Sequence, residues 1–158
     1  MDIAVTFPGG KRVDANFSGF TVRTDQPPEF GGDASEAAPY ELFLASMATC
    51  AGIYALGFCQ ARKLPTEGLS VVQHNTFDPE THLVTSVRYT LQLPKDFPER
   101  YRTAIVRAVE NCKVKKSLAS PPTFAVDVLG RSRRAPQSPR HRSQKTRRFK
   151  PRQGRPTS

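Results

Sequence analysis

The longest apolar segment of the chain, residues 38–63, predicts a helix at the centre of the fold. No charged residue stands between Glu41 and Arg62, and apolar or small residues fall on every side of the helical projection. Pro39 suits the first turn of a helix, where its missing N–H is not needed. Glu41 then lies near the positive end of the helix dipole and Arg62 near the negative end. Because the segment is apolar all round, we expect it to be buried.

Burial in lipid is one interpretation, since about 20 uncharged residues are long enough to cross a bilayer. The segment is only weakly hydrophobic, because Ala, Gly, Ser, Thr, Cys and Gln make up much of it. That composition is typical of a closely packed interior helix. The chain starts Met1-Asp2 and continues with an alternating pattern instead of an apolar block, so no signal peptide is expected. We expect a soluble, cytoplasmic protein that does not contact a membrane.

Alternating apolar and polar positions predict strands on both sides of the central helix. Three strands are expected before it, at residues 2–7, 12–17 and 20–24. Two more, at 69–77 and 83–93, follow it as a hairpin, and a last strand is expected at 123–129.

A second helix is predicted at residues 97–112, because its apolar residues recur with helical spacing. The stripe consists of Phe97, Tyr101, Ala104, Ile105, Ala108, Val109 and Cys112. A short helical turn is expected at 114–119. The predicted order is β-β-β-α-β-β-α-β, which is an α+β fold.

Charge divides the chain into two parts. The whole chain has 24 basic and 14 acidic residues, a net charge of +10, but residues 131–158 hold 11 of the basic residues and no acidic one. We expect a single domain at residues 1–130 and a basic, disordered tail at 131–158, which has too few apolar residues to bury. The favoured interpretation of the tail is a solvated extension. Binding of nucleic acid through its Lys and Arg side chains is the alternative.

Three cysteines, Cys50, Cys59 and Cys112, carry the candidate chemistry. An odd number without CxxC spacing argues against a disulfide scaffold and against a zinc site, and favours a reducing compartment. The three histidines are scattered, with no further ligand at metal-binding spacing. We expect neither a metal nor a cofactor.

Cys50 shares a helix face with Phe43, Met47 and Tyr54, and Cys112 ends the apolar stripe of the second helix. Both stripes should face the same core, so the two thiols are candidates for a dithiol redox pair. The alternative is that each is a small buried hydrophobic residue. Cys59 lies about 180° round the helix from Cys50, so the two cannot bond within a straight helix, and a structural role is expected for Cys59.

The segment PYELFLASMATCAG around Cys50, followed by NCKVKKSL around Cys112 and by PPTFAVDV, resembles the OsmC/Ohr family of osmotically induced and organic-hydroperoxide-resistance proteins. The resemblance covers residues 3–129 in order and spacing. It implies an OsmC-like fold and an intertwined homodimer, in which six-stranded sheets wrap around two central helices. It also implies that the functional sites lie at the subunit interface.

The resemblance further implies a catalytic role for the thiols. Peroxidase members of the family attack the hydroperoxide with the first cysteine, here Cys50. They resolve the resulting sulfenic acid with the second, here Cys112. They also use a Glu and an Arg beside the thiolate, which correspond to Glu41 and Arg12.

Three positions depart from the pattern of the hydroperoxide-resistance branch. The Glu of that branch lies ten residues before the first cysteine, where this chain has Tyr40, whereas Glu41 lies nine before it, as in other OsmC-like branches. Lys11 directly follows the glycine turn where the Arg is expected, which makes Arg12 a shifted match and Arg23 a third candidate. The usual Cys-Pro-Val is Cys-Lys-Val here.

Two functions are therefore expected. The first is a thiol-dependent peroxidase that reduces organic or inorganic hydroperoxides with a thiol reductant. The alternative is a non-catalytic OsmC-like domain that binds a small apolar ligand in the dimer cleft. A cation close to Cys50 would favour the peroxidase, because a buried thiol needs one to ionise.

Overall fold

The computed structural model describes residues 1–128, so the predicted disordered tail at 131–158 lies outside the described residues. The chain divides into two units, Met1–Thr123 and Phe124–Ser158, and each is described by itself. The elements follow one another as β1-β2-β3-α1-β4-β5-α2-α3, with two short 3-10 helices between them.

The first three strands form an antiparallel sheet in the order β1-β2-β3. They are β1 (Ala4–Gly9), β2 (Arg12–Phe17) and β3 (Phe20–Val22). Gly10 adopts a positive φ of 59° in the turn between β1 and β2, a conformation that glycine takes without strain. The three predicted strands are confirmed, although the third ends two residues earlier than expected.

The loop from β3 to α1 is organised around the buried carboxylate of Asp25. It accepts hydrogen bonds from the backbone N–H groups of Gln26, Asp33 and Ser35 and from the Ser35 hydroxyl. These bonds, the Ser35 hydroxyl first among them, lower the pKa of Asp25 to about 2. A 3-10 turn, η1 (Pro28–Phe30), lies within the loop. The carboxylate thus fixes the path by which the chain enters the central helix.

The central helix is α1 (Pro39–Ala61), which begins at the proline that the sequence placed in its first turn. Its buried stripe consists of Met47, Ala51, Ala55, Phe58 and Cys59. The opposite side is open, and Ile53 is 59 % exposed. The expected burial on every side therefore does not hold within one chain. By length and composition α1 is also capable of crossing a membrane, a property it shares with core helices of soluble proteins.

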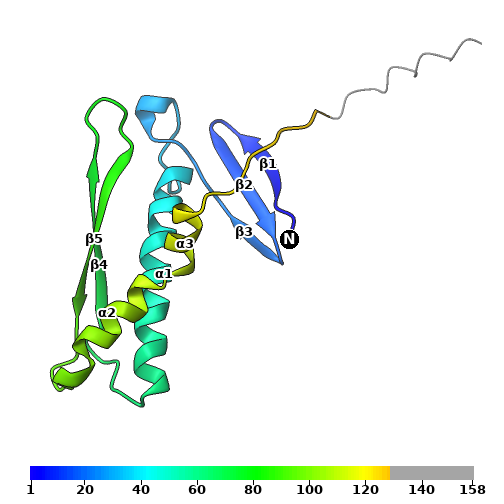
Figure 1. Ribbon diagram of the computed structural model, residues 1–158. Coiled ribbons are helices and arrows are strands. Elements are labelled where there is room, and N and C mark those ends of the chain that lie inside the picture. The colour runs from blue at the N-terminus through cyan, green and yellow to red at the C-terminus, as the bar shows by residue number, and fades with distance from the viewer. Residues whose placement is uncertain (129–158) are drawn as a thin grey trace, which may run out of the picture. The chain divides into compact units, whose positions relative to one another are not determined.

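The second sheet is an antiparallel hairpin of β4 (Ser70–Phe77) and β5 (Val84–Gln92), with Gln73 directly opposite Tyr89. Figure 1 shows this hairpin running alongside α1. Val71, Tyr89 and Leu91 face the core and pack against its buried residues. The two strands confirm the predicted hairpin.

The second helical region has three pieces, where a helix at 97–112 and a short helical turn at 114–119 were predicted, and the predicted turn is confirmed. The three pieces are η2 (Glu99–Tyr101), α2 (Arg102–Glu110) and α3 (Lys113–Ala119), and both α2 and α3 contact α1 (Figure 1). The predicted stripe is confirmed, with Phe97, Ile105, Val109 and Cys112 buried. The predicted helix to residue 112 is wrong in one respect, because the chain turns at Cys112 (φ −50°, ψ 128°) and α3 begins there.

The last predicted strand is not formed in the part of the chain that the structure describes. Residues 123–128 carry no strand, and residue 129 lies outside the described range. Phe124, Val126 and Val128 have the alternation of a half-buried strand but are about nine-tenths exposed. A strand needs a neighbouring backbone edge for its hydrogen bonds, which an alternating sequence alone does not supply.

Candidate functional site

The structure brings two of the three thiols together. Cys50 lies in α1 and is half-buried, whereas Cys112, between α2 and α3, is fully buried. Each thiol changes the pKa of the other, so the two are close neighbours, and both are free. Cys50 and Cys112 were selected from the sequence as a redox pair because both lie on core-facing stripes.

The surroundings of Cys50 favour its thiolate. Burial by itself would raise the pKa of Cys50, but the Cys112 thiol and the backbone N–H groups of Val114 and Lys113 outweigh it. Together with the positive charge of Lys115, they lower the pKa below that of an ordinary thiol. Cys50 is therefore suited to attack as a nucleophile.

Cys112 is affected in the opposite direction. Burial raises its pKa, and the neighbouring Cys50 raises it further. From the sequence, Cys112 was expected at the negative C-terminal end of a helix. The structure instead places it at the N-terminal end of α3, whose first N–H groups lower the pKa without overcoming burial. The pair is thus asymmetric, with Cys50 the better thiolate and Cys112 the better thiol.

Lys115 is the residue of this site that the sequence analysis did not single out for the thiolate. It is half-buried in α3, and its Nζ lies 5.1 Å from the centre of the Tyr89 ring, within the range of a cation–π interaction. The same ammonium is close enough to Cys50 for its positive charge to lower the pKa of that thiol. The only sequence signal was the run of lysines after Cys112, which does not show which of them turns inward.

Cys59 lies elsewhere in the fold. It is fully buried in the hydrophobic core with Ala55, Phe58 and Ile105. Burial raises its pKa, and the nearby Arg62 lowers it only in part. A buried, protonated thiol in an apolar cluster fits the structural role expected for this residue.

The other predicted site residues lie at different places. Glu41 accepts a hydrogen bond from the backbone N–H of Ala38 at 2.8 Å and so caps α1. Arg12 and Arg23 line a pocket of about 290 Å³ together with Asp14 and further residues of the β1–β3 region and the following loop. Within residues 1–128, the cation that lowers the pKa of Cys50 is Lys115 and not an arginine. Catalytic roles for Glu41 and Arg12 stay predictions.

Two buried polar atoms have no hydrogen-bond partner within the described part of the chain. They are the Tyr89 hydroxyl and Gln73 Oε1, which come from directly opposite positions of β5 and β4. The Gln73 amide nitrogen donates to Leu44 O and to Asn75 Oδ1, so it is already used.

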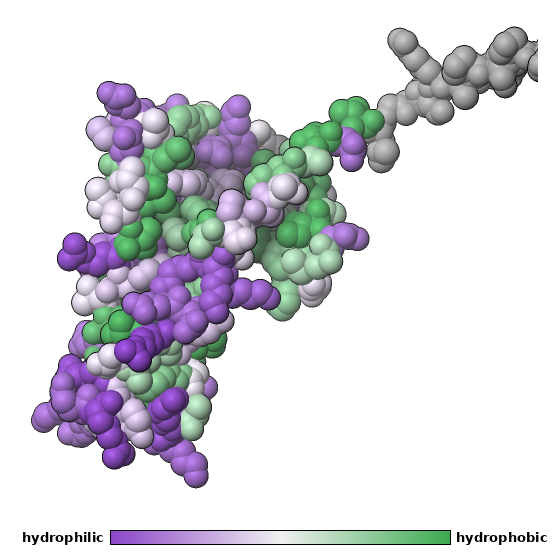
Figure 2. All heavy atoms as spheres, viewed as in Figure 1, coloured by the Kyte–Doolittle hydropathy of each residue, from purple (hydrophilic) through white to green (hydrophobic). Residues whose placement is uncertain are grey.

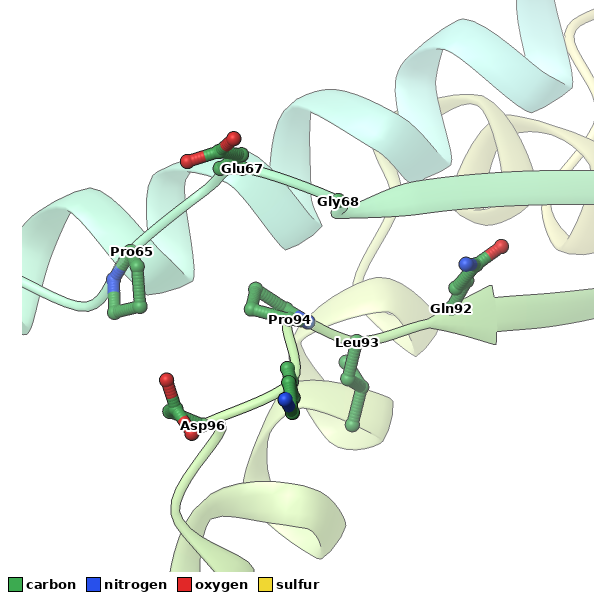
Figure 3. Close-up of a pocket in the computed structure, with 8 residues that line it drawn as sticks. Pro65, Glu67, Gly68, Gln92, Leu93, Pro94 and Asp96 are labelled. Carbon is green, nitrogen blue, oxygen red and sulfur yellow. The ribbon is translucent and has the colours of Figure 1, made fainter.

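Two further pockets among the described residues are not lined by a cysteine. One of about 520 Å³, drawn in Figure 3, is formed by the loop after α1 and by the end of β5 with its following loop. It is lined by residues such as Glu67, Pro94 and Asp96 and by no cysteine. A more apolar pocket of about 450 Å³ includes Ile53, Phe58 and Arg62. Among residues 1–128, no cluster of three His, Cys, Asp or Glu side chains is arranged to hold a metal ion.

Two solved structures share the fold. One, from Psychrobacter arcticus 273-4, has a description that refers to osmotic stress induction and a detoxification response. It has a TM-score of 0.63 and 19% identity over 73% of this chain and 85% of its own. The other, whose description names no function, has a TM-score of 0.59 and 18% identity over 77% and 91%.

A third, less similar structure is described as an organic hydroperoxide resistance protein OsmC from Legionella pneumophila, a predicted redox protein and regulator of sulfide bond formation. It has a TM-score of 0.49 and 17% identity over 75% of this chain and 89% of its own. No curated protein matches the sequence significantly. The family model described as OsmC-like protein matches residues 32–127, more than half of the chain. This protein therefore belongs to the OsmC-like family.

Proposed function

We propose that this protein is a thiol-dependent peroxidase that reduces hydroperoxides through Cys50 and Cys112. The observation that carries the proposal is the asymmetry of the two neighbouring thiols, with the pKa of Cys50 lowered and that of Cys112 raised. A nucleophile and a resolving thiol need this division, since the thiolate is the attacking form.

The first step oxidises Cys50. Its thiolate attacks the terminal oxygen of the hydroperoxide, an S–O bond forms and the O–O bond breaks. Sulfur loses two electrons, the peroxide gains them, and the leaving alkoxide takes up a proton to become an alcohol. Cys50 is then a sulfenic acid.

The second step forms a disulfide. The Cys112 sulfur attacks the Cys50 sulfur, the S–O bond breaks, and the hydroxide leaves as water with the proton of Cys112. A dithiol reductant then restores both thiols by two thiol–disulfide exchanges and becomes a disulfide itself. The cycle balances with the hydroperoxide and the dithiol as its only reactants.

We also propose that the protein is a cytoplasmic homodimer. One side of α1 exposes Ile53, and hydrophobic side chains reach the surface on the face drawn in Figure 2. Exposed apolar area of this kind favours association. In such a dimer, Arg12 or Glu41 of one subunit would be available to the thiols of the other.

Peroxide consumption with cysteine variants tests the peroxidase. Wild type is expected to consume an organic hydroperoxide in the presence of a dithiol and to form a Cys50–Cys112 disulfide. Cys50→Ser should abolish turnover. In Cys112→Ser, Cys50 should be oxidised once to a sulfenic acid that cannot be resolved and that further peroxide over-oxidises. Cys59→Ala, which removes the core thiol, is the matched control and should stay active, although less stable. Turnover by Cys50→Ser, measured by mass spectrometry and peroxide assay, would refute the proposal.

The apolar pocket around Ile53 and Phe58 favours one alternative, a domain that binds a small apolar ligand without catalysis. In that case wild type and Cys50→Ser would bind an apolar fluorescent probe equally well, and neither would consume peroxide. A peroxidase would differ between the two proteins in consumption.

A further inference from the structure

The two neighbouring thiols differ in their exposure to solvent as well as in their acidity. Cys50 lies in the middle of α1 and is half-buried, so part of this residue can be reached from outside. Cys112 is 0 % exposed. A thiol reductant therefore meets two sulfurs of unequal access when a disulfide joins the pair.

The backbone of Cys112 is held on both sides. Its N–H donates to Val109 O at 3.3 Å, and its carbonyl oxygen accepts from the N–H of Lys116 at 3.1 Å. Cys112 thus connects the end of α2 to the first turn of α3, and both helices contact α1. Because the residue is tied to both helices, this connection has to open locally before the Cys112 sulfur can be reached.

Reduction of a disulfide begins when a thiolate attacks one of the two sulfurs and the other one leaves. Two properties direct the choice: access to the attacked sulfur and the acidity of the thiol that leaves. Acidity would direct the attack to Cys112, because Cys50 is the more acidic thiol and so the better leaving group. Burial of Cys112 opposes that attack. Burial prevails, because acidity only scales the rate of an attack that can occur, whereas a sulfur that solvent does not reach cannot be attacked.

We propose that the thiol reductant attacks the Cys50 sulfur of the Cys50–Cys112 disulfide, with Cys112 as the leaving group. A bond forms between the reductant sulfur and the Cys50 sulfur, and the bond between the two cysteines breaks. Cys112 leaves as a thiolate and takes up a proton. This order of exchange rests on the proposed peroxidase function, and it assigns the mixed disulfide with the reductant to Cys50.

The second exchange then uses the acidity of Cys50. The second thiolate of a dithiol reductant attacks the reductant's own sulfur in the mixed disulfide, so the reductant becomes a cyclic disulfide and Cys50 leaves as a thiolate. The surroundings of Cys50 stabilise that thiolate. Two electrons have passed from the dithiol to the protein, and Cys50 is again in the form that attacks a hydroperoxide. Access thus directs the first exchange, and acidity favours the second.

The test traps the mixed disulfide. The full-length protein is oxidised with one equivalent of cumene hydroperoxide, and peptide mass spectrometry first verifies the Cys50–Cys112 disulfide. Mercaptoethanol, a monothiol that cannot complete the second exchange within one molecule, is then added for increasing times. Each sample is quenched in acid, and its free thiols are blocked with N-ethylmaleimide.

The position of the earliest adduct is the result that matters, because later exchange between the thiols can move it. Extrapolated to zero time, the mercaptoethanol adduct is expected on Cys50 in roughly tenfold or greater excess over Cys112, with the maleimide on Cys112.

Two controls separate access from intrinsic reactivity. In concentrated urea both sulfurs of the same oxidised protein are exposed, so the preference for Cys50 should disappear and the adduct should fall on both cysteines. Cys59→Ala removes the third thiol. This variant should show the same preference for Cys50 as wild type, which excludes exchange through Cys59.

The outcomes distinguish the two proposals. A zero-time adduct on Cys112, or in equal amounts on both cysteines, overturns the attack on Cys50 and leaves the peroxidase standing. An unchanged preference for Cys50 in urea means that burial does not direct the attack, and it overturns the proposed order of exchange too. A wild type in which the hydroperoxide forms no Cys50–Cys112 disulfide overturns the peroxidase, and the order of exchange with it.

Discussion

Residue by residue, the reactivity of Cys50 depends on a balance between burial and a few favourable partners. Burial is the largest single influence on its pKa and acts against the thiolate. The Cys112 thiol, two backbone N–H groups and Lys115 together reverse it. Among these, the Lys115 side chain is the one that a mutation removes without disturbing the backbone or the thiol pair. It is therefore the natural point at which to measure the balance.

Lys115→Gln is expected to raise the pKa of Cys50 towards that of an ordinary thiol. A cation stabilises the thiolate, so its loss lowers the thiolate fraction at neutral pH. Alkylation of Cys50 by iodoacetamide at pH 7 should slow by up to roughly fivefold, because a partly exposed ion pair is worth about 1 kcal/mol or less. Its pH profile should move to higher pH. The matched control is Lys116→Gln, an exposed neighbour in α3, whose profile should coincide with that of wild type.

At the scale of elements, the helices and the first five strands followed from periodicity, whereas the strand predicted at 123–129 and the joints between elements did not. The hairpin β4–β5 and the stripe of the second helix were predictable because each element has a single period over eight or nine residues. The sequence predicted that the second helix ends at Cys112 and that a short helical turn follows at 114–119, but it did not predict the direction in which the chain turns between them. That turn determines the electrostatic environment of Cys50, because it brings the N–H groups of Lys113 and Val114 and the charge of Lys115 close to the thiol. The pairing of Cys50 with Cys112 was therefore predictable, whereas its electrostatics were not.

The loop before α1 makes a contribution to stability that depends on pH, and the hydrogen bonds to Asp25 determine the direction of that dependence. Asp25 has a pKa of about 2 in the fold, against about 3.9 for a free aspartate. A lowered pKa stabilises the fold at every pH above the free value, and this contribution is lost as the pH falls through about 2.

Asp25→Asn should therefore be less stable than wild type at pH 7 and approach it in stability near pH 2. Urea denaturation at both pH values measures the difference. Asp33→Asn, a change at an exposed carboxylate of the same loop, is the control and should show no such convergence. A constant gap between Asp25→Asn and wild type across the range would contradict the assignment.

For the whole molecule, the open side of α1 is the feature that a single chain leaves unexplained. The sequence predicted burial all round, yet within one chain the buried stripe covers only one side. Ile53 lies on the other side and is 59 % exposed, in the middle of the helix. Full burial of an isoleucine side chain contributes about 1.5–3 kcal/mol. Each exposed apolar residue on this side of α1 would therefore favour association with a second copy that covers it.

Ile53→Glu is accordingly expected to convert a dimer into a monomer, because a buried, unpaired carboxylate in the interface would cost more than the contact gains. Sedimentation at micromolar concentration should give twice the chain mass for wild type and the chain mass for the variant. Val72→Glu places the same charge at a valine that is 48 % exposed on β4 and should remain dimeric. If wild type itself sediments as one chain, the homodimer is excluded, and any arginine that serves Cys50 must come from the same chain. If wild type is a dimer and Ile53→Glu is a monomer, peroxide turnover by the variant will show whether the thiol pair works without a partner subunit.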